Sequence, residues 1–282
     1  MTKNKSIKKI DSPEEREYHT PSAGVFFKIK NLLYRQNSLY QKIEVFKNEY
    51  FGNVLLLDDL VQTTERDEFF YHEMIVHPAL VAHPAPQDVL IIGGGDGGAL
   101  KEVLRFPINY VCLVEIDPQV IEVSKKYFRW LSPCLKNQRT ELVIADGKKF
   151  IGETDKRFDI ILVDSSDPVG PSASLHQKRF YKKLKNCLNK NGIVVAQAGS
   201  PFFHLSSIKQ KSTSLKELFN VVSFYVSPVP TYPGGTWCFA FLSDGINPLH
   251  TRRDPPSGLN YFNLDIHRSA FSLPNFLKEK LE

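Results

Sequence analysis

The sequence predicts an α/β fold in which a doubly wound sheet follows a small N-terminal antiparallel β domain. From residue 86 onward, wholly apolar runs rich in β-branched residues alternate with helically spaced segments, as in a parallel sheet covered on both faces. The first of these runs ends in a glycine-rich turn at 93–98. Before residue 86 the strand-like runs are short and are joined by turn residues. We therefore divide the chain into an N-terminal β-strand domain with a linking helix, 1–85, and a doubly wound domain, 86–282.

The N-terminal part contains three short runs that are typical of strands, at 40–48, 53–59 and 60–64. Turn residues separate them, so the three runs are expected to form an antiparallel sheet. The segment 65–83 begins with acidic residues and carries apolar residues at helical spacing. This pattern predicts an amphipathic helix, which Pro78 is expected to bend or end.

The C-terminal part contains further apolar runs, each of strand length. The predicted strands are 88–95, 109–117, 141–146, 158–164, 192–199, 221–228 and 237–244. Helical spacing follows the first two of them, at 99–106 and 120–128. Only a turn around Pro233-Gly234-Gly235 separates the last two strands. This turn is too short for a crossover helix, so the two strands are expected to pair antiparallel.

Composition limits the class of protein. Apolar residues make up 42% of the 282 residues and charged residues 24%, which indicates a packed globule and excludes extensive disorder. We find neither a signal peptide nor an apolar run of about 18 residues, so no membrane partner is expected. The four cysteines are scattered, which favours free thiols in a cytoplasmic protein over disulfides or a metal site. The net charge of +5 is spread along the chain, so we do not expect a nucleic-acid partner.

Acidic residues follow several predicted strands, at the edge where a doubly wound sheet binds ligands. The turn GGGDGG matches the pattern GxGxxG through Gly93, Gly95 and Gly98. Glu115 ends the next strand, where a carboxylate accepts hydrogen bonds from ribose hydroxyls. Asp146-Gly147 ends the third, in a position to meet an adenine amino group. The alternative for each acid is a helix N-cap.

Asp96 lies inside the glycine turn itself. A dinucleotide would place its pyrophosphate against this turn, and a carboxylate there would repel the phosphates. The same carboxylate would attract an ammonium or a sulfonium. Asp96 therefore favours an S-adenosyl-type cofactor over a dinucleotide.

The segment DSSDPVGP, at 164–171, follows the fourth strand and is the most specific part of the sequence. Asp164 and Asp167 place two carboxylates in one short loop, which Pro168 and Pro171 make rigid. With Asp96 they form an anionic pocket in a basic protein. Such a concentration of like charge requires a cation to balance it, so the site predicts a diamine or polyamine ligand.

These segments together resemble the spermidine synthases, the polyamine aminopropyltransferases. The resemblance extends from about Leu39 to Asp244 and is carried by YQKIEVF, GNVLLLDDLVQTTERDEFFYHEM, VLIIGGGDGG, VEID, ADG, VDSSDPVGP and PTYPGG. The C-terminal segment at 261–274 is similar to the tail of that family. The resemblance implies a Rossmann-like, methyltransferase-type catalytic domain.

The resemblance also implies a reaction. The aminopropyl group of decarboxylated S-adenosylmethionine, a co-substrate, would move to putrescine and give spermidine and methylthioadenosine. No permanently bound cofactor and no metal are expected. A homodimer, or a homotetramer built from dimers, is implied.

The resemblance assigns roles to particular residues. Asp164 would be the catalytic proton acceptor, with Tyr71 beside it. Substrate contacts would come from His72, Asp96, Asp164, Ser165, Asp167 and Tyr232. Donor contacts would come from Gln41, Gln62, Gly93, Gly95, Asp96, Glu115, Asp146, Gly147 and Pro171. The 164–171 loop would act as a lid that excludes water, with Gly170 as its hinge.

Three alternatives stay open at this point. One is an S-adenosylmethionine-dependent N-methyltransferase of a diamine, and another is aminopropyl transfer to cadaverine, agmatine or spermidine. The third is a non-catalytic binder of polyamines or nucleic acid. Asp96 favours a donor arm that ends in an ammonium, and Asp164 favours catalysis. Gln197-Ala198-Gly199 is less polar than the same stretch in many relatives, which leaves the choice of acceptor open.

Overall fold

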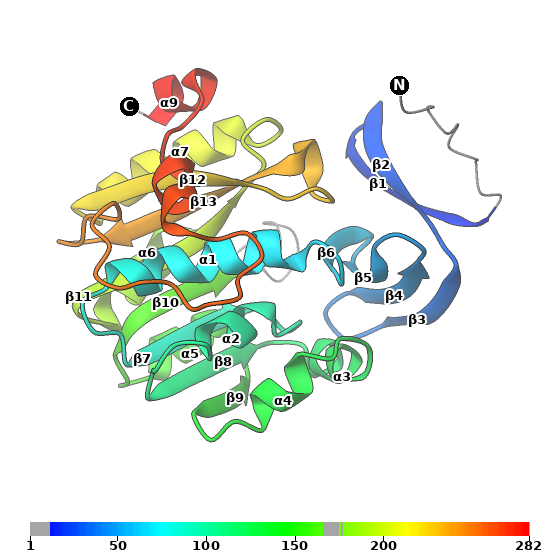
Figure 1. Ribbon diagram of the computed structural model, residues 1–282, viewed down its shortest axis with the longest axis horizontal. Helices are drawn as coiled ribbons and strands as arrows, with labels where there is room; N and C mark the ends of the chain where they lie inside the picture. Colours follow the sequence, from blue (N-terminus) through cyan, green and yellow to red (C-terminus); the bar gives the residue numbers. More distant parts are fainter. Residues whose placement is uncertain (1–11, 166–174, 176, 282) are drawn as a thin grey trace.

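The computed structural model describes residues 12–165, 175 and 177–281, and within these ranges the chain forms three sheets (Figure 1). The sequence predictions at Asp167, Pro168, Gly170 and Pro171, including the lid and its hinge, lie outside the described residues. Within the described part of the chain, no helix is long and apolar enough to cross a membrane.

The N-terminal part contains two antiparallel sheets. One is a hairpin of β1 (Glu14–Thr20) and β2 (Ala23–Lys28). The other is a four-stranded meander of β3 (Asn31–Asn37), β4 (Lys42–Asn48), β5 (Gly52–Leu57) and β6 (Leu60–Thr64). The last three strands match the prediction, whereas the sequence analysis missed the first three. Strands β1 and β3 are rich in polar residues and partly exposed, and β2 has its apolar residues in one short run, so none of the three shows the alternation that identifies a strand.

The meander packs on both of its faces. Phe46, Val54 and Leu56 face one way and join Phe27 of the hairpin in one apolar cluster. On the other face the sheet packs against Val120 of α3 (Pro118–Tyr127), so the N-terminal part lies directly on the C-terminal part of the chain.

Helix α1 (Glu68–Ala82) links the two parts and differs from its prediction in two ways. It is not amphipathic, because every side chain from Tyr71 to Ala82 is buried. Nor does it end at Pro78, which lies inside the helix. A proline removes the bond to the carbonyl four residues earlier, here that of Met74. The Tyr225 hydroxyl donates to this carbonyl instead, at 2.7 Å, so the helix continues.

The large sheet has seven strands in the order β12-β13-β11-β10-β7-β8-β9. Their bounds are β7 (Asp88–Gly93), β8 (Tyr110–Glu115), β9 (Thr140–Ile144), β10 (Phe158–Asp164), β11 (Leu188–Gly199), β12 (Val221–Pro228) and β13 (Thr236–Ser243). Strands β7 to β11 pair parallel, and β13 pairs antiparallel with both β11 and β12. The antiparallel pairing of the last two strands is confirmed.

Helices cover both faces of this sheet. Alternate residues of β7 face opposite ways: Val89 and Ile91 belong to one apolar cluster, and Leu90 and Ile92 to the other. The first cluster includes residues of α1, α2 (Gly98–Val103), α3, α4 (Leu131–Leu135) and α8 (Leu264–Ala270). The second includes residues of α5 (Gly147–Glu153), α6 (Lys178–Asn186), α7 (Leu205–Lys216) and α9 (Asn275–Leu281). The predicted fold class is confirmed.

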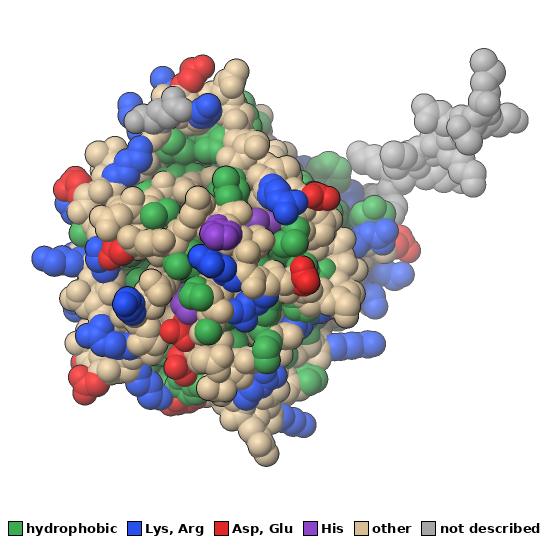
Figure 2. Space-filling view, turned by 60° about the vertical axis from the view of Figure 1, so that its left-hand side comes forward, with side chains coloured by type: hydrophobic (Ala, Val, Ile, Leu, Met, Phe, Trp, Pro, Cys, Tyr) green, Lys and Arg blue, Asp and Glu red, His purple; other side chains and the backbone are tan. Residues whose placement is uncertain are grey.

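Lys and Arg side chains are scattered over the face drawn in Figure 2, among acidic and neutral ones. On that face the positive charge therefore forms no continuous stripe of the kind that tracks a nucleic-acid backbone. The strand order reverses beside β7, since β8 follows on one side and β10 lies on the other. A doubly wound sheet binds its ligands at such a point.

Candidate active site

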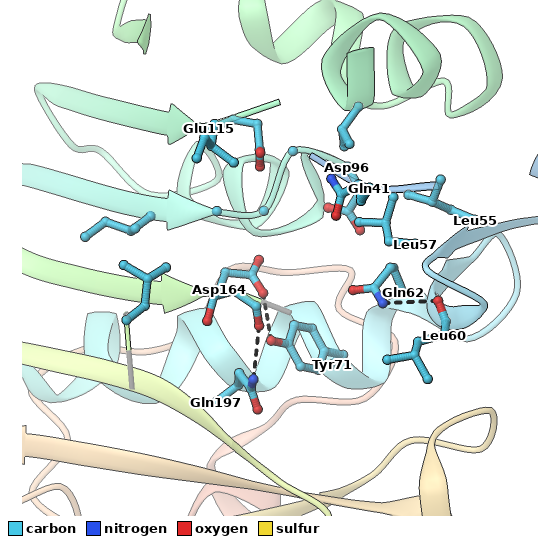
Figure 3. Close-up of a pocket in the computed structure, with 18 of the residues that line it drawn as sticks. Gln41, Leu55, Leu57, Leu60, Gln62, Tyr71, Asp96, Glu115, Asp164 and Gln197 are labelled. Atoms are coloured by element: carbon cyan, nitrogen blue, oxygen red, sulfur yellow. Dashed lines mark hydrogen bonds between the residues drawn. The ribbon is translucent and has the colours of Figure 1, made fainter. Parts of the chain in front are cut away.

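A cavity opens at this reversal point, between the carboxyl ends of the sheet strands and the N-terminal meander (Figure 3). Asp164 and Glu115 lie at strand ends on one side, and Gln41 and Gln62 approach from the meander. Every described residue of the predicted site lines this cavity: Gln41, Gln62, Tyr71, His72, Gly93, Gly95, Asp96, Glu115, Asp146, Gly147, Asp164, Ser165 and Tyr232. The topology thus brings together side chains that are far apart in the sequence.

The glycine turn between β7 and α2 is shaped around Asp164. Gly93 and Gly94 both have positive φ, at 82° and 69°, a conformation that glycine adopts without strain. A Cβ atom on Gly93 would lie 2.3 Å from the Asp164 carbonyl oxygen, and one on Gly94 would lie 2.7 Å from its Oδ2. The glycines therefore make room for the protein's own acid as well as for a ligand.

Asp164 ends β10 with one oxygen bonded and the other not. Its Oδ1 accepts a 2.7 Å hydrogen bond from the Tyr71 hydroxyl. Its Oδ2 is shielded from water and has no hydrogen-bond partner among the described residues. Burial, and then the charge of Asp96, raise the pKa of Asp164 to about 6. A carboxyl group with this pKa, and with one oxygen that accepts no hydrogen bond from the described residues, is suited to accept a proton near neutral pH.

Tyr71 supports Asp164 from α1. Its ring packs against those of Tyr232 and Phe239, with centroids 5.5 and 5.3 Å away. Burial and the neighbouring Asp164 raise the pKa of Tyr71 well above its usual value, so its hydroxyl stays protonated and acts as a donor. Tyr232 in turn donates to the backbone carbonyl of Gln62, which joins the turn before β13 to the meander.

Glu115 ends β8 and is buried. Its Oε1 accepts from the backbone N–H of Asp117 at 2.9 Å. Its Oε2 lies against the glycine turn, 2.8 Å from where a Cβ of Gly95 would be. Burial raises the pKa of Glu115 to about 7. Hydroxyl groups that donate to it would favour its charged form.

Asp117 was missed by the sequence analysis and connects the two parts of the chain. Its Oδ2 accepts from the Ser38 hydroxyl at 2.6 Å and from Gln41 Nε2 at 3.1 Å. Its Oδ1 accepts from the backbone N–H of Gln119 and caps α3. The sequence signal was only Asp-Pro at a helix start, which identifies a cap and not a contact between distant segments.

Asp146 also acts as a helix cap, as the alternative interpretation of the strand-end acids allowed. Its Oδ1 accepts from the backbone N–H groups of Lys148 and Lys149, at 2.7 and 3.4 Å, and begins α5. It lines the cavity as well. A Cβ atom on Gly147 would lie 2.4 Å from the Ile92 side chain, which explains the glycine that follows the cap.

Asp96 and His72 form a buried pair. His72 Nε2 lies 3.2 Å from Asp96 Oδ2, and Asp96 Oδ1 accepts from the backbone N–H of Gly98 at 2.9 Å. Burial opposes charge on both groups, but His72 and the Gly98 N–H lower the pKa of Asp96 below its usual value. Asp96 therefore lines the cavity as a carboxylate that is already paired with the His72 side chain.

Two further polar residues line the cavity. Glu17 comes from β1, is buried, and accepts a 2.9 Å hydrogen bond from the backbone N–H of Val61. It was missed because β1 is mostly polar and carries no pattern that identifies a strand. Gln197, at the end of β11, donates from Nε2 to the carbonyl of Ser165 at 3.0 Å, so the unusual stretch that begins with it touches the Asp164 loop.

Comparison with known proteins identifies one family over most of the chain. The family profile described as the spermine/spermidine synthase domain matches residues 68–251, and the spermidine synthase tetramerisation domain matches residues 15–65. The polyamine aminopropyltransferase of Methanocaldococcus jannaschii is 41% identical over 275 residues, 94% of either chain. That of Shouchella clausii is 40% identical over 269 residues, covering 94% of this chain and 98% of its own.

Solved structures agree with these sequence matches. A spermidine synthase in complex with the transition-state analogue AdoDATO has a TM-score of 0.93 and 35% identity, covering 97% of this chain and 96% of its own. The spermidine synthase of Thermotoga maritima has a TM-score of 0.91 at the same identity and coverage. The predicted resemblance is confirmed. This chain belongs to the spermine/spermidine synthase family of enzymes, the polyamine aminopropyltransferases.

Proposed function

We propose that the enzyme transfers the aminopropyl group of decarboxylated S-adenosylmethionine to putrescine, giving spermidine and methylthioadenosine. The observation that carries the proposal is Asp164, which lines the same cavity as Asp96 and whose Oδ2 has no hydrogen-bond partner among the described residues. Family membership supports the reaction class. The similar spermidine synthase in complex with the transition-state analogue AdoDATO supports a site for the transfer reaction in this fold.

The donor fits the side of the cavity formed by β7, β8 and β9. Glu115 offers its carboxyl to the ribose hydroxyls, and Asp146 with Gly147 lies at the base end of the nucleoside. Asp96 lies on the turn where the aminopropyl ammonium would be, and attraction between opposite charges would hold it there. Gln41 and Gln62 would cover the donor from the meander, with Pro171 as the predicted contact beyond the described residues.

The acceptor fits the side that contains Asp164 and Tyr71. Asp164 would hold and deprotonate the attacking nitrogen, with Ser165, His72 and Tyr232 around it. Glu17 supplies another buried carboxylate from the opposite side, and Asp167 is the predicted contact outside the described residues. Acids on both sides of one cavity suit a chain with a charge at either end, which favours a diamine.

The reaction needs proton transfer more than activation of the leaving group. The amine nitrogen attacks the carbon next to the sulfonium, the C–S bond breaks, and sulfur keeps the electron pair as a neutral thioether. An alkylammonium has a pKa of about 10.4, so the attacking nitrogen must first lose a proton. Asp164 accepts it, and its pKa of about 6 makes it a stronger base than an ordinary aspartate.

A product assay tests the proposal. Purified enzyme is offered putrescine, cadaverine, agmatine and spermidine together, with decarboxylated S-adenosylmethionine and, separately, with ordinary S-adenosylmethionine. We expect spermidine and methylthioadenosine with the first donor and no methylated amine with the second. Methylated putrescine as the main product would overturn the proposal, and a different aminopropylated amine would change the acceptor.

We also propose a homodimer or a homotetramer built from dimers, working in the cytoplasm. The N-terminal segment matches the tetramerisation domain, and it carries exposed apolar side chains such as Tyr18, Phe26 and Leu39. All four cysteines lie within the described residues and are free thiols, which suits a reducing compartment. Light scattering coupled to gel filtration distinguishes the two assemblies.

A further inference from the structure

A row of alternating charges runs from the cavity into the interface between α1 and α2. Behind the Asp96–His72 pair, His72 Nδ1 lies 2.7 Å from Glu68 Oε2. Glu68 Oε1 accepts from Lys101 Nζ at 2.6 Å, and Lys101 also lies 3.3 Å from Glu102 Oε1. Only Asp96 and His72 of this row line the cavity, so Glu68 and Lys101 form its second layer.

The row is enclosed by protein. The side chains of His72 and Glu68 are 2% and 9% exposed, and Lys101 lies over the ring of Trp130. Gly98 makes space for the histidine, since a Cβ atom there would lie 2.1 Å from the His72 ring. The third glycine of the GxGxxG pattern therefore makes room for this side chain, and any larger residue there would collide with the ring.

The geometry fixes the protonation of the ring. Each nitrogen of His72 faces a carboxylate, and carboxylates only accept hydrogen bonds, so both nitrogens must carry a hydrogen. Burial alone would lower the pKa of His72, but Asp96 and then Glu68 raise it well above its usual value. Loss of the Glu68 charge would favour a neutral ring, which has one unprotonated nitrogen. If that nitrogen faced Asp96, it would repel the Asp96 carboxylate.

We propose that Glu68 and Lys101 are positioning residues of the donor site, which act through His72 to hold the Asp96 carboxylate toward the aminopropyl ammonium. Lys101 balances the charge of Glu68, and Glu68 keeps His72 a double donor. His72 and the Gly98 N–H then fix one oxygen of Asp96 each. This inference rests on the proposed function, because it assumes a donor whose transferred arm ends in an ammonium.

Glu68→Gln tests the inference with two ligands that differ in that arm. Decarboxylated S-adenosylmethionine carries the ammonium and methylthioadenosine does not. We expect titration calorimetry to show affinity for the first falling on the order of tenfold, as for partners that orient a ligating side chain, with affinity for the second unchanged. The KM for the donor should rise in parallel.

Lys101 provides the conservative comparison. Lys101→Met should weaken donor binding in the same selective way, and Lys101→Arg should restore it because the positive charge returns. Glu122→Gln is the matched control, since Glu122 forms an exposed pair with Lys125 on α3. We expect no change in either affinity for this control. If Lys101 served only to fill space, Lys101→Met and Lys101→Arg would bind the donor with equal affinity. That result would overturn the inference.

Histidine ¹⁵N chemical shifts supply a readout that is independent of turnover. Wild type should show His72 with both nitrogens protonated at neutral pH, and Glu68→Gln should show a neutral ring. An unchanged His72 signal, or equal loss of affinity for both ligands, would overturn the inference. Wild-type enzyme that failed to make spermidine would instead overturn the proposed function, so the two failures are distinguishable.

Discussion

Asp164 is both held in one orientation and made more basic by its surroundings, which an aspartate on the surface would not be. Its Tyr71 hydrogen bond fixes one oxygen, and burial beside Asp96 makes the other a better base. The glycines of the turn allow the carboxylate to lie against the backbone. The rate of transfer should therefore depend on this side chain more than on any other in the cavity.

Asp164→Asn tests this dependence. Asparagine keeps the shape and still accepts from Tyr71, but it cannot take a proton. We expect kcat to fall by about 10²- to 10⁴-fold, the usual contribution of general base catalysis. Steady-state assays measure the loss, and methylthioadenosine binding verifies that the donor site is intact. Exposed Asp155, in the loop before β10, gives the control Asp155→Asn, which should be fully active. Wild-type turnover in Asp164→Asn would remove the residue from its assigned role.

The pH dependence of activity should follow the ionisation of Asp164. The carboxylate must be ionised to accept a proton, so kcat/KM should fall as pH drops below about 6. The hydrogen bond from Tyr71 is one of the interactions that lower the pKa of Asp164. Tyr71→Phe keeps the ring contacts but loses this bond, so the acid limb should move to higher pH. A pH–rate profile of both proteins measures the shift, and an unmoved or lowered limb would contradict it.

At the scale of single residues, the sequence was sufficient where function follows from position on a strand. Asp96, Glu115, Asp146 and Asp164 each follow an apolar run, and strand ends in a doubly wound sheet converge. Glu17 and Asp117 could not be found in this way. Their importance comes from contacts with segments about 40 and 80 residues away in sequence, which local spacing does not encode.

Helix α1 shows how an element can contradict its own pattern. Its apolar residues suggested one buried face, but the sheet and the C-terminal segment cover its other faces as well. Glu73, for example, is buried because its carboxylate accepts from the backbone N–H groups of Tyr261 and Phe262. Polar residues that read as a solvated face are in fact satisfied inside the protein. The hydrogen bond from Tyr225 to Met74 likewise replaces what Pro78 removes.

The Tyr225 bond predicts a measurable coupling between β12 and α1. Tyr225→Phe keeps the stacked ring but leaves the buried Met74 carbonyl without that donor, so the free energy of unfolding should fall by about 1–3 kcal/mol. Pro78→Ala restores a backbone N–H that can bond to the same carbonyl. Urea unfolding of both single variants and the double variant forms a cycle. The tyrosine substitution should cost less in the Pro78→Ala background, and equal costs would contradict this account.

On the scale of the whole molecule, the cavity is shared between two parts of the chain. The catalytic domain supplies the strand-end acids, and the N-terminal part supplies Glu17, Gln41 and Gln62. The division of the chain at residue 86 stays a prediction. The fold class of the sheet could be predicted because its strands are apolar throughout. The closure of the N-terminal sheets over it could not, because it depends on contacts between distant segments, namely the apolar packing of the meander on α3 and the hydrogen bonds to Asp117.

Within the described residues, four hydrogen bonds tie the meander to α3 and to its N-cap residue Asp117. Asp117 accepts from Ser38 and Gln41. At the other end of α3, Asn53 Nδ2 donates to the carbonyl of Tyr127, and the Tyr127 hydroxyl donates to the carbonyl of Leu33, both at 2.8 Å. The Asp117 contacts lie next to Glu115, the expected ribose ligand. Closure of the meander and shape of the nucleoside site are therefore coupled through one side chain.

Asp117→Asn separates this coupling from the helix cap. The asparagine carbonyl can still cap α3, since asparagine is as good a cap as aspartate, but its amide group cannot accept from Ser38 and Gln41. Gln41 is then released, and we expect methylthioadenosine affinity to fall by about tenfold, the equivalent of one charged hydrogen bond. Titration calorimetry measures this affinity, with Ser38→Ala as the variant that removes one contact only.

Affinity for decarboxylated S-adenosylmethionine should fall by the same factor, because the loss concerns the nucleoside that both ligands share. Glu68→Gln, in contrast, is expected to affect only the ligand with an ammonium. The two variants together would then show that the two ends of the donor are held by different parts of the molecule. Retention of full methylthioadenosine affinity in Asp117→Asn would show that the meander does not shape the nucleoside site.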